Sequence, residues 1–387
     1  MAEQLSGGEL VALIQRVFRP APHDRGLAIL VDLPDREVPD TPAWRQRREI
    51  ATDWARELSA RAAELGLHIH LVAYRNVRTN NGDLPVSAWV LPPSSPLPHD
   101  AKELDPVTAM PFAEIYATHS MLIALTQFSA TAPLKMAAQR HPIRAATMPG
   151  FTPAMIPALR LDWGEINRRV EILADLLTQA EAAEIDFRHP GGVAHLTLDL
   201  RFRRAHASGG LLPTPGMAGN LPSGEAYIVP YEGEREGEPS GSRGELPVQF
   251  EGGEIVLYRV EENRAVDVLS SGAVSRREAA AIAAEPAYAN LAELGLGVLA
   301  ELGIKPIGEV LLDEKLGLHI AFGRSEHFGG QVGPGHFSSP AAVIHIDRVY
   351  IPETQPDVRV ERVDLIMPGG AAVPVMRQHA YVLDWNS

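Results

Sequence analysis

The chain has 387 residues, of which 45% are hydrophobic and 22% are charged, so it can bury a large core and we expect two packed domains. Its 35 basic and 49 acidic residues leave a net charge of −14, which repels nucleic-acid phosphates and excludes nucleic acid as an expected partner. It has no cysteine, and this excludes disulfides, thiolate metal sites and a cysteine nucleophile.

The first residues show no basic segment followed by an apolar core, so we expect no secretory signal. No run approaches the roughly 18 consecutive apolar residues of a membrane span. The expectation is therefore a soluble, cytoplasmic protein without a membrane partner.

Residues 1–150 predict an N-terminal open α/β domain. Apolar positions recur at helical spacing over 10–18, and a second helical stretch runs from about residue 43 to Gly66. Three nearly continuous apolar runs predict buried strands: 27–33, 68–74 and 120–128. Strand, helix and strand at this spacing form a βαβ unit with a parallel sheet. No G-x-G-x-x-G motif or phosphate loop is present, so nucleotide binding has no support.

Residues 151–387 predict a mixed, mostly antiparallel α+β catalytic domain. Asp162 and Glu165 precede an apolar helix face that ends near Leu177. Alternating apolar residues over 185–202 predict a hairpin with one buried face. The remaining patterns predict strands at 225–231, 254–260, 316–323 and 342–351, and helices near 275–286 and 288–302.

The pair His345 and Asp347 is the best candidate for metal ligation. On a strand, residues i and i+2 point the same way, so both side chains face one side of the sheet. An imidazole and a carboxylate aimed together form half of a zinc, manganese or iron site. The commoner alternative for such a pair is a local hydrogen bond.

Further acidic and histidine candidates lie on other elements of the same half. They are Glu225 after a turn, Glu293 in an apolar run, Glu309 just before another apolar run, the polar turn Asp313-Glu314-Lys315, and His319 in an apolar strand. Each has an ordinary structural alternative, such as a core histidine, a solvated helix face or a solvated turn. Together they are harder to dismiss, because buried carboxylates are costly unless paired or metal-bound.

A glycine-rich stretch, 328–337, lies between the two parts of this set. It predicts either a loop over the site or an ordinary hairpin connection. His327 and His336 lie in or beside it, and we expect both to be exposed and available to a substrate.

Five segments together resemble the aminopeptidase T family of metallopeptidases. They are AATMPGFTPAM (145–155), GNLPSGEAYIVPYEGE (219–234), LAELGLG (291–297), IGEVLLDEKLGLHIAFG (307–323) and VIHIDRVY (343–350). The resemblance covers roughly residues 140–352, while the earlier part matches in general pattern only. It implies a metal-dependent aminopeptidase that removes N-terminal residues from short peptides, holds two divalent ions (zinc, cobalt, manganese or magnesium) and forms a homodimer.

Carried over motif by motif, the family's metal ligands fall on Glu225, Glu293, His319, His345 and Asp347. Two divalent ions activate a bridging water and polarise the carbonyl group. Either Glu293 or Glu225 would bridge the ions, and either Glu225 or Glu314 would accept the proton of the water.

One departure concerns a tyrosine that better-known members carry a few residues after the HIAFG segment. Here that stretch reads Arg324-Ser325-Glu326-His327. The hypothesis is that His327 or Arg324 replaces the tyrosine as the hydrogen-bond donor to the oxyanion.

Two other readings stay open. The 2,5-dihydroxypyridine dioxygenases are similar to this family and use one iron(II) held by two histidines and one aspartate, a set that His319, His345 and Asp347 would satisfy. A single iron does not need Glu225 and Glu293, so their presence favours two ions. The missing tyrosine motivates the third reading, a non-catalytic peptide-binding protein.

Overall fold

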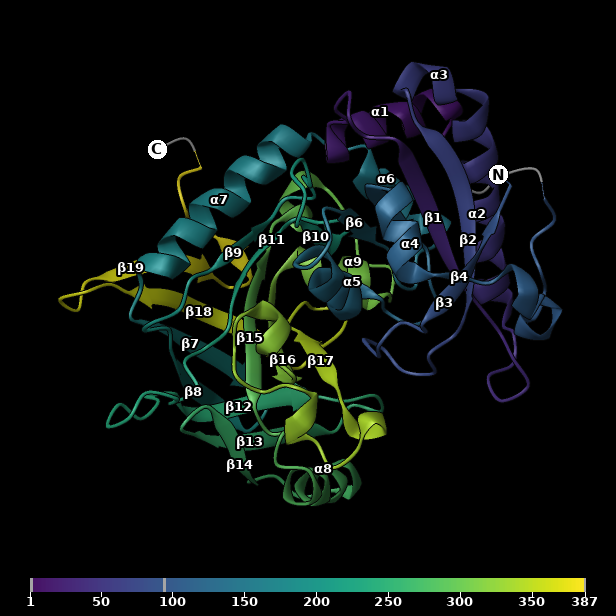
Figure 1. Cartoon of the computed structure of the whole chain (residues 1–387). Helices are drawn as coiled ribbons and strands as arrows, with labels where there is room; N and C mark the ends of the chain where they lie inside the picture. Colours follow the sequence, from purple (N-terminus) through teal and green to yellow (C-terminus); the bar gives the residue numbers. More distant parts are fainter. Residues whose placement is uncertain (1–2, 93–94, 386–387) are drawn as a thin grey trace. The chain divides into compact units, whose positions relative to one another are not determined.

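The computed structural model describes residues 3–92 and 95–385 (Figure 1). Contacts divide the chain into two compact units, and each unit draws on two stretches of the sequence. The first unit runs to Trp163 and also includes Gly210–Ser223, whereas the second comprises Gly164–Gly209 and Gly224–Ser387. The first unit therefore extends beyond residue 150 and includes a later segment that the sequence pattern did not indicate.

The first unit is built on a seven-stranded sheet with the order β10-β6-β5-β1-β2-β3-β4. Its strands are β1 (Gly26–Leu33), β2 (His68–Arg75), β3 (Ser87–Leu91), β4 (Met110–Pro111), β5 (Met121–Ala124), β6 (Arg144–Thr147) and β10 (Ala218–Asn220). Its helices are α1 (Gly7–Phe18), α2 (Pro42–Ala60), α3 (Ala62–Leu65), α4 (Phe112–Thr118), α5 (Thr131–Ala138) and α6 (Ile156–Leu159). The strands from β10 to β2 pair in parallel, and β3 and β4 pair antiparallel.

Local sequence explains where the elements of the first unit begin and end. Every residue of β1 is buried, as expected for a central parallel strand covered on both faces. Ser6 and Glu9 form a capping box at the start of α1, and Thr41 caps α2 just before Pro42. Gly66 ends α3 with a positive φ of 67°, a conformation that glycine adopts without strain.

The second unit contains two sheets in which all strand pairs are antiparallel. The five-stranded sheet has the order β17-β16-β15-β11-β9, and the eight-stranded sheet has the order β14-β13-β12-β8-β7-β18-β19-β20. The smaller sheet contains β9 (His206–Ser208), β11 (Glu225–Ile228), β15 (Leu291–Gly297), β16 (Leu318–Gly323) and β17 (His345–Val349).

The larger sheet contains β7 (Ala182–His189), β8 (Gly192–Asp199), β12 (Arg243–Gln249), β13 (Ile255–Glu261), β14 (Arg264–Val268), β18 (Arg359–Ile366), β19 (Ala372–Arg377) and β20 (Ala380–Tyr381). The helices are α7 (Trp163–Gln179), α8 (Ala273–Ala284) and α9 (Val310–Asp313). Helix α8 lies beside β13 and β14 (Figure 1).

Burial distinguishes the two sheets. Residues of β7 alternate between buried and partly exposed, the pattern of a sheet with one covered face. By contrast, every residue of β15 and of β16 is buried, so the centre of the five-stranded sheet is covered on both faces. Polar groups on these two strands are therefore taken out of water.

The expected α/β and α+β fold class is confirmed by this mixture of helices and sheets. The prediction of a helix near 288–302 is wrong, because β15 occupies Leu291–Gly297 and a short 3-10 turn follows at Leu299–Leu302. Gly295 and Gly297 lower helix propensity, and both positions are packed so closely that a Cβ atom would overlap a neighbouring residue. Within residues 3–92 and 95–385, no helix has the length and apolar character needed to cross a bilayer.

Candidate metal centre

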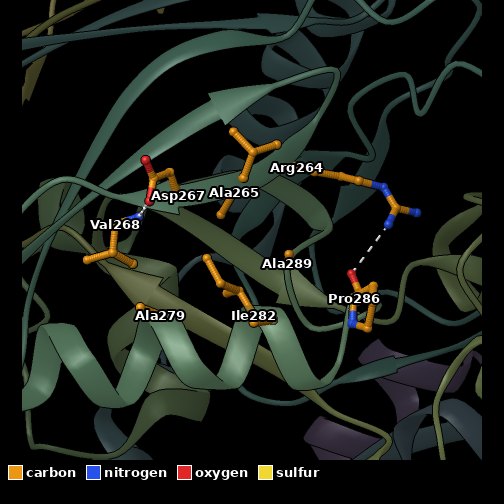
Figure 2. A pocket seen from close by; sticks show the side chains of 10 residues that line it. Arg264, Ala265, Asp267, Val268, Ala279, Ile282, Pro286 and Ala289 are labelled. Atoms are coloured by element: carbon orange, nitrogen blue, oxygen red, sulfur yellow. Dashed lines mark hydrogen bonds between the residues drawn. The ribbon is translucent and has the colours of Figure 1, made fainter.

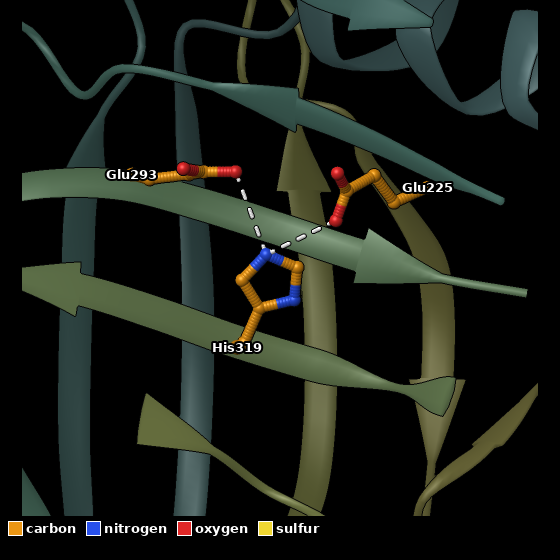
Figure 3. A group of neighbouring side chains, drawn as sticks. All are labelled: Glu225, Glu293 and His319. Carbon is orange, nitrogen blue, oxygen red and sulfur yellow. Dashed lines mark hydrogen bonds and ion pairs between the residues drawn. The ribbon is translucent and has the colours of Figure 1, made fainter. Parts of the chain in front are cut away.

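Four neighbouring strands bring together the five side chains that the sequence predicted as metal ligands. Glu225 begins β11, Glu293 lies in β15, His319 lies in β16, and His345 and Asp347 lie in β17. These strands are adjacent in the sheet order β17-β16-β15-β11. Figure 3 shows the His319 imidazole directed between the carboxylates of Glu225 and Glu293.

The candidate ligands form two groups that share one carboxylate. In the first group, His319 Nε2 lies 3.4 Å from Glu225 Oε2 and 3.4 Å from Glu293 Oε1. In the second, His345 Nε2 lies 3.2 Å from Glu293 Oε2 and 3.5 Å from Asp347 Oδ1. Glu293 therefore directs one oxygen to each group.

These separations fit donor atoms around a metal ion. Two ligands held at about 2.1 Å from one ion are roughly 3.0–3.4 Å apart in octahedral or tetrahedral geometry. Glu225 Oε2 is also buried with no hydrogen-bond partner among the described residues. A buried carboxylate oxygen is costly unless a cation or a donor satisfies it, so the donor set fits divalent ions.

His345 is oriented by a second hydrogen bond. Its Nδ1 lies 2.8 Å from the carbonyl oxygen of Arg324, to which an Nδ1–H would donate. That bond selects the tautomer with a free Nε2, the atom that faces Glu293 and Asp347. The local arrangement therefore presents the correct nitrogen for ligation.

The two groups of candidate ligands differ in how deeply they are buried. Glu225, Glu293 and His319 are 5%, 3% and 0% exposed, whereas His345 and Asp347 are only partly buried as residues. The second group therefore lies nearer to solvent than the first.

The imidazoles and carboxylates of the cluster shift one another's pKa. Burial lowers the pKa of His319, but the hydrogen bond to Glu293 and the charge of Glu225 outweigh burial and raise it to about 9. The pKa of His345 is also raised by the neighbouring carboxylates, against the effect of burial. The pKa of Glu293 and that of Asp347 are lowered by the same histidines although burial opposes this. The carboxylates of the metal-free cluster thus attract cations, and protons bound to His319 and His345 supply the positive charge.

Lys315 is part of this site, although the sequence analysis placed it in a polar turn and gave it no role. Its Nζ lies 2.5 Å from Glu225 Oε1 and also donates to Glu314. Burial lowers the pKa of Lys315, yet the two carboxylates reverse the direction and raise it, so the side chain stays charged. Burial raises the pKa of Glu314 to about 8, with Lys315 opposing and Asp347 adding to the rise. The polar turn expected at 313–315 is therefore buried and belongs to the cluster.

The glycines of LAELGLG have a clear packing role. A Cβ atom on Gly295 would overlap the imidazole of His319 on the neighbouring strand. A Cβ atom on Gly297 would overlap the backbone of Lys315. Only glycine lets these two site residues lie so close to β15.

His327 is buried, contrary to the expectation that it is exposed, whereas His336 is exposed as expected. The His327 ring lies 5.2 Å from the His345 ring and 3.9 Å from that of Phe328. Phe328 in turn lies 5.3 Å from His345. The segment therefore forms an aromatic wall beside one candidate ligand.

The segment that carries this wall is held by Glu232, which the sequence prediction missed. This carboxylate accepts from Ser325 Oγ at 2.6 Å, Asn290 Nδ2 at 2.8 Å and the Gln331 backbone N–H at 2.5 Å, and it pairs with Arg203 at 3.1 Å. In the sequence analysis, Glu232 appeared only as part of the segment GNLPSGEAYIVPYEGE (219–234).

The remaining acidic candidates stay outside the cluster. Asp313 accepts from the backbone N–H groups of Ile307 and Gly308, which is a structural role. Glu309 immediately precedes α9 and makes no side-chain cap there. Neither belongs to the two candidate ligand groups of the described residues.

A separate pocket of about 370 Å³ lies between β14 and α8 (Figure 2). Its lining is mainly apolar, with Ala265, Val268 and Ile282 among the side chains that face it. Arg264 donates to the Pro286 carbonyl oxygen at its rim. None of the candidate metal ligands lines this pocket, so it is not part of the centre.

No family model matches the chain, and no curated protein matches it. Among solved structures, the chain is similar to the 2,5-dihydroxypyridine dioxygenase from Pseudomonas putida KT2440, with a TM-score of 0.62 and 12% sequence identity. The match covers 98% of this chain and 99% of that chain. At this identity the likeness shows a shared fold.

Proposed function

We propose that the protein is a metal-dependent enzyme whose two-ion centre hydrolyses the first peptide bond of short peptides. The observation that supports it best is the position of Glu293, whose two carboxylate oxygens belong to different ligand groups. A carboxylate in this position would hold two divalent ions, the arrangement on which hydrolytic two-metal sites depend.

When bound, two divalent ions would supply a nucleophilic water near neutral pH and a polarised carbonyl group. The surrounding side chains would then act as metal ligands and as the proton acceptor. Glu225 has one oxygen engaged by Lys315 and the other directed at His319, an arrangement that suits a ligand. Glu314 belongs to neither ligand group and accepts a hydrogen bond from Lys315, so it is left to take the proton from water and return it to the leaving amine.

The partly exposed side of the cluster suits the N-terminus of a peptide. His345 and Asp347 lie on that side. With divalent ions bound, a free amine beside these two residues would complete the ligand set, which would restrict cleavage to the first residue. The proposal includes a homodimer, which size-exclusion chromatography with light scattering tests.

A second candidate, a single-iron(II) ring-cleaving dioxygenase, is favoured by the structural match over the whole chain. Its ligands would be His319, His345 and Asp347. In the described part of the chain these three do not form one ligand group, because His319 is grouped with Glu225 and Glu293. The comparison therefore favours the dioxygenase, whereas the ligand geometry favours the hydrolase.

Elemental analysis of the purified protein separates the two candidates. The hydrolase predicts about two equivalents of zinc, cobalt or manganese per chain, with release of p-nitroaniline from aminoacyl-p-nitroanilides. One iron per chain, with oxygen-dependent activity on a dihydroxypyridine and none on peptides, would replace it with the dioxygenase. Metal and bound peptide without turnover of either substrate would support the non-catalytic alternative.

Glu293→Gln gives the matched test, because it keeps the side-chain volume and removes the bridging charge. We expect at least 100-fold lower peptide hydrolysis and a loss of one metal equivalent. Glu251→Gln, a change at an exposed acid outside the cluster, serves as the control.

A further inference from the structure

Strand β17 lies at an edge of the five-stranded sheet, where β16 is its neighbour. At one end of the pairing, the Tyr350 N–H donates to the Leu318 carbonyl oxygen. At the other end, the Arg324 N–H donates to the Ile344 carbonyl oxygen. Bonded positions alternate along an antiparallel pair, so the even-numbered residues of β17 direct their backbone groups at β16.

The odd-numbered residues of β17 direct their backbone groups away from the sheet. Among the described residues, no partner takes the N–H or C=O of His345 or Asp347 on that side. At Val349 the carbonyl oxygen is already taken, by Thr354 Oγ1 at 2.6 Å and by Gln355 Nε2 at 3.0 Å. The open edge is therefore two residues long and contains two donors and two acceptors.

These two residues also supply the candidate ligands of the second group. The His345 and Asp347 side chains face Glu293, while their backbone groups face the open edge. Both residues are partly exposed, unlike the fully buried strands β15 and β16. A chain that paired with this edge would therefore lie directly beside the ligand cluster.

We propose that the open edge of β17 binds the start of an extended peptide as an added strand, with hydrogen bonds to the backbone of His345 and Asp347. This inference rests on the proposed function and specifies how that site recognises its substrate. An added strand uses the N–H and C=O of residues i and i+2, so two open positions match about three peptide residues. Recognition through the main chain also makes binding tolerant of side-chain identity.

The proposed function fixes the end of the peptide that lies at the centre. The open edge runs beside His345 and Asp347, whose side chains belong to the second ligand group. In the metal-loaded protein, a free N-terminal amine placed there would complete the ligand set of that group. The paired strand therefore presents its N-terminal residue to the ligands.

Backbone N-methylation of a peptide substrate tests the inference, because it removes one donor without changing any side chain. On the metal-loaded protein we compare tetraalanine with two analogues, methylated at the amide nitrogen of the third or of the fourth residue. Alternation along a strand predicts that one analogue raises KM about tenfold, the factor of one lost hydrogen bond. The other should change KM less than about twofold, and kcat should change little in both. Equal effects of the two methyl groups would overturn the inference.

Hydrogen exchange supplies a readout that does not depend on turnover. The probe is a tetraalanine whose first peptide bond is replaced by a methylene-amine link. We expect at least tenfold slower exchange of the His345 and Asp347 amides when this probe binds, and little change for Ile346 and Arg348, which already face β16. Unchanged exchange at His345 and Asp347 with saturating probe would contradict the added strand.

The two results distinguish the inference from the function on which it rests. If the peptide is hydrolysed but the two methyl groups have equal effects on KM and the His345 and Asp347 amides are not protected, strand addition is overturned. The peptidase function is then still supported. Protection without hydrolysis would support strand addition and overturn the peptidase. If the protein shows no hydrolysis and no protection, both strand addition and the peptidase function are overturned.

Discussion

Lys315 and Glu225 form a buried ion pair in which the lysine Nζ lies 2.5 Å from Glu225 Oε1, while Glu225 Oε2 faces His319. The lysine is 1% exposed and the glutamate 5%. The pair holds Glu225 in one orientation and leaves its second oxygen for a cation. A structural ion pair thus positions a candidate metal ligand.

Lys315→Met tests this relationship because it keeps the length of the side chain and removes its charge. Without metal, Glu225 keeps only the protonated His319 as a cationic neighbour, and we expect a loss of about 3–5 kcal/mol in the free energy of unfolding. Divalent metal should recover part of that loss. Urea denaturation with and without metal measures both effects. Lys305→Met, at an exposed position, is the control, and equal stabilities of the two variants would refute the role of Lys315.

Metal binding should release protons at pH 7. His319 has a pKa raised to about 9, so it is protonated in the metal-free protein and must lose that proton to become a ligand. We expect metal affinity to rise with pH up to about 9 and activity to fall on acidification. Calorimetry in two buffers with different ionisation enthalpies measures the released protons, and a binding enthalpy independent of the buffer would contradict histidine ligation.

The same pKa sets how the stability of the metal-free protein depends on pH. The folded pKa of His319, about 9, exceeds the value of 6.5 for an ordinary histidine, so the folded state binds the proton more tightly. This contribution is fully present below about pH 6.5 and is lost as the pH rises through about 9. Urea denaturation should therefore show a less stable metal-free protein at pH 9.5 than at pH 7. A metal-loaded sample should lose less, since its histidine carries no proton.

Gly295→Ala should disturb the centre without adding a polar group. Its new methyl group would overlap the His319 imidazole, which must move away from Glu225 and Glu293. We expect metal affinity to fall at least tenfold, as a displaced ligand implies. Gly335→Ala is the control, because a Cβ there meets no atom within 4 Å. A chelator competition titration measures both, and equal affinities would contradict the packing role of Gly295.

Glu232→Ala should loosen the segment that carries His327 and Phe328. The change removes the shared acceptor of Ser325, Asn290 and the Gln331 backbone. Removing the acceptor leaves buried donors unpaired, which costs about 1–3 kcal/mol, so we expect a loss of about 3 kcal/mol in unfolding free energy. Metal content should be retained, because none of these residues is a candidate ligand. A variant as stable as the original protein would show that this network contributes little.

Sequence pattern predicted the parts of the fold that depend on local periodicity. The run at 27–33 corresponds to β1, and the alternation at 185–202 corresponds to the β7–β8 hairpin. It failed at Leu291–Gly297, where a helix was expected, because LAELGLG combines helix formers with glycines that only tertiary packing explains. The return of Gly210–Ser223 to the first unit also depends on long-range contacts that no local pattern contains.

The five candidate ligands converge as the motifs suggested, whereas Lys315, Glu232 and the burial of His327 did not follow from the sequence. Lys315 lies in a polar run that on its own is typical of a solvated turn. Its burial depends on the close approach of Gly297 on the neighbouring strand, which is a tertiary contact. Motifs predicted which candidate ligands lie together, but the charge balance between them required three-dimensional structure.

Anomalous X-ray diffraction from crystals soaked in zinc or cobalt tests the two-ion centre most directly. We predict two anomalous peaks, roughly 3.5–4 Å apart. One peak should lie between Glu225, Glu293 and His319, and the other between Glu293, His345 and Asp347. A single peak bound by His319, His345 and Asp347, with Glu293 outside its coordination sphere, would contradict the two-ion centre.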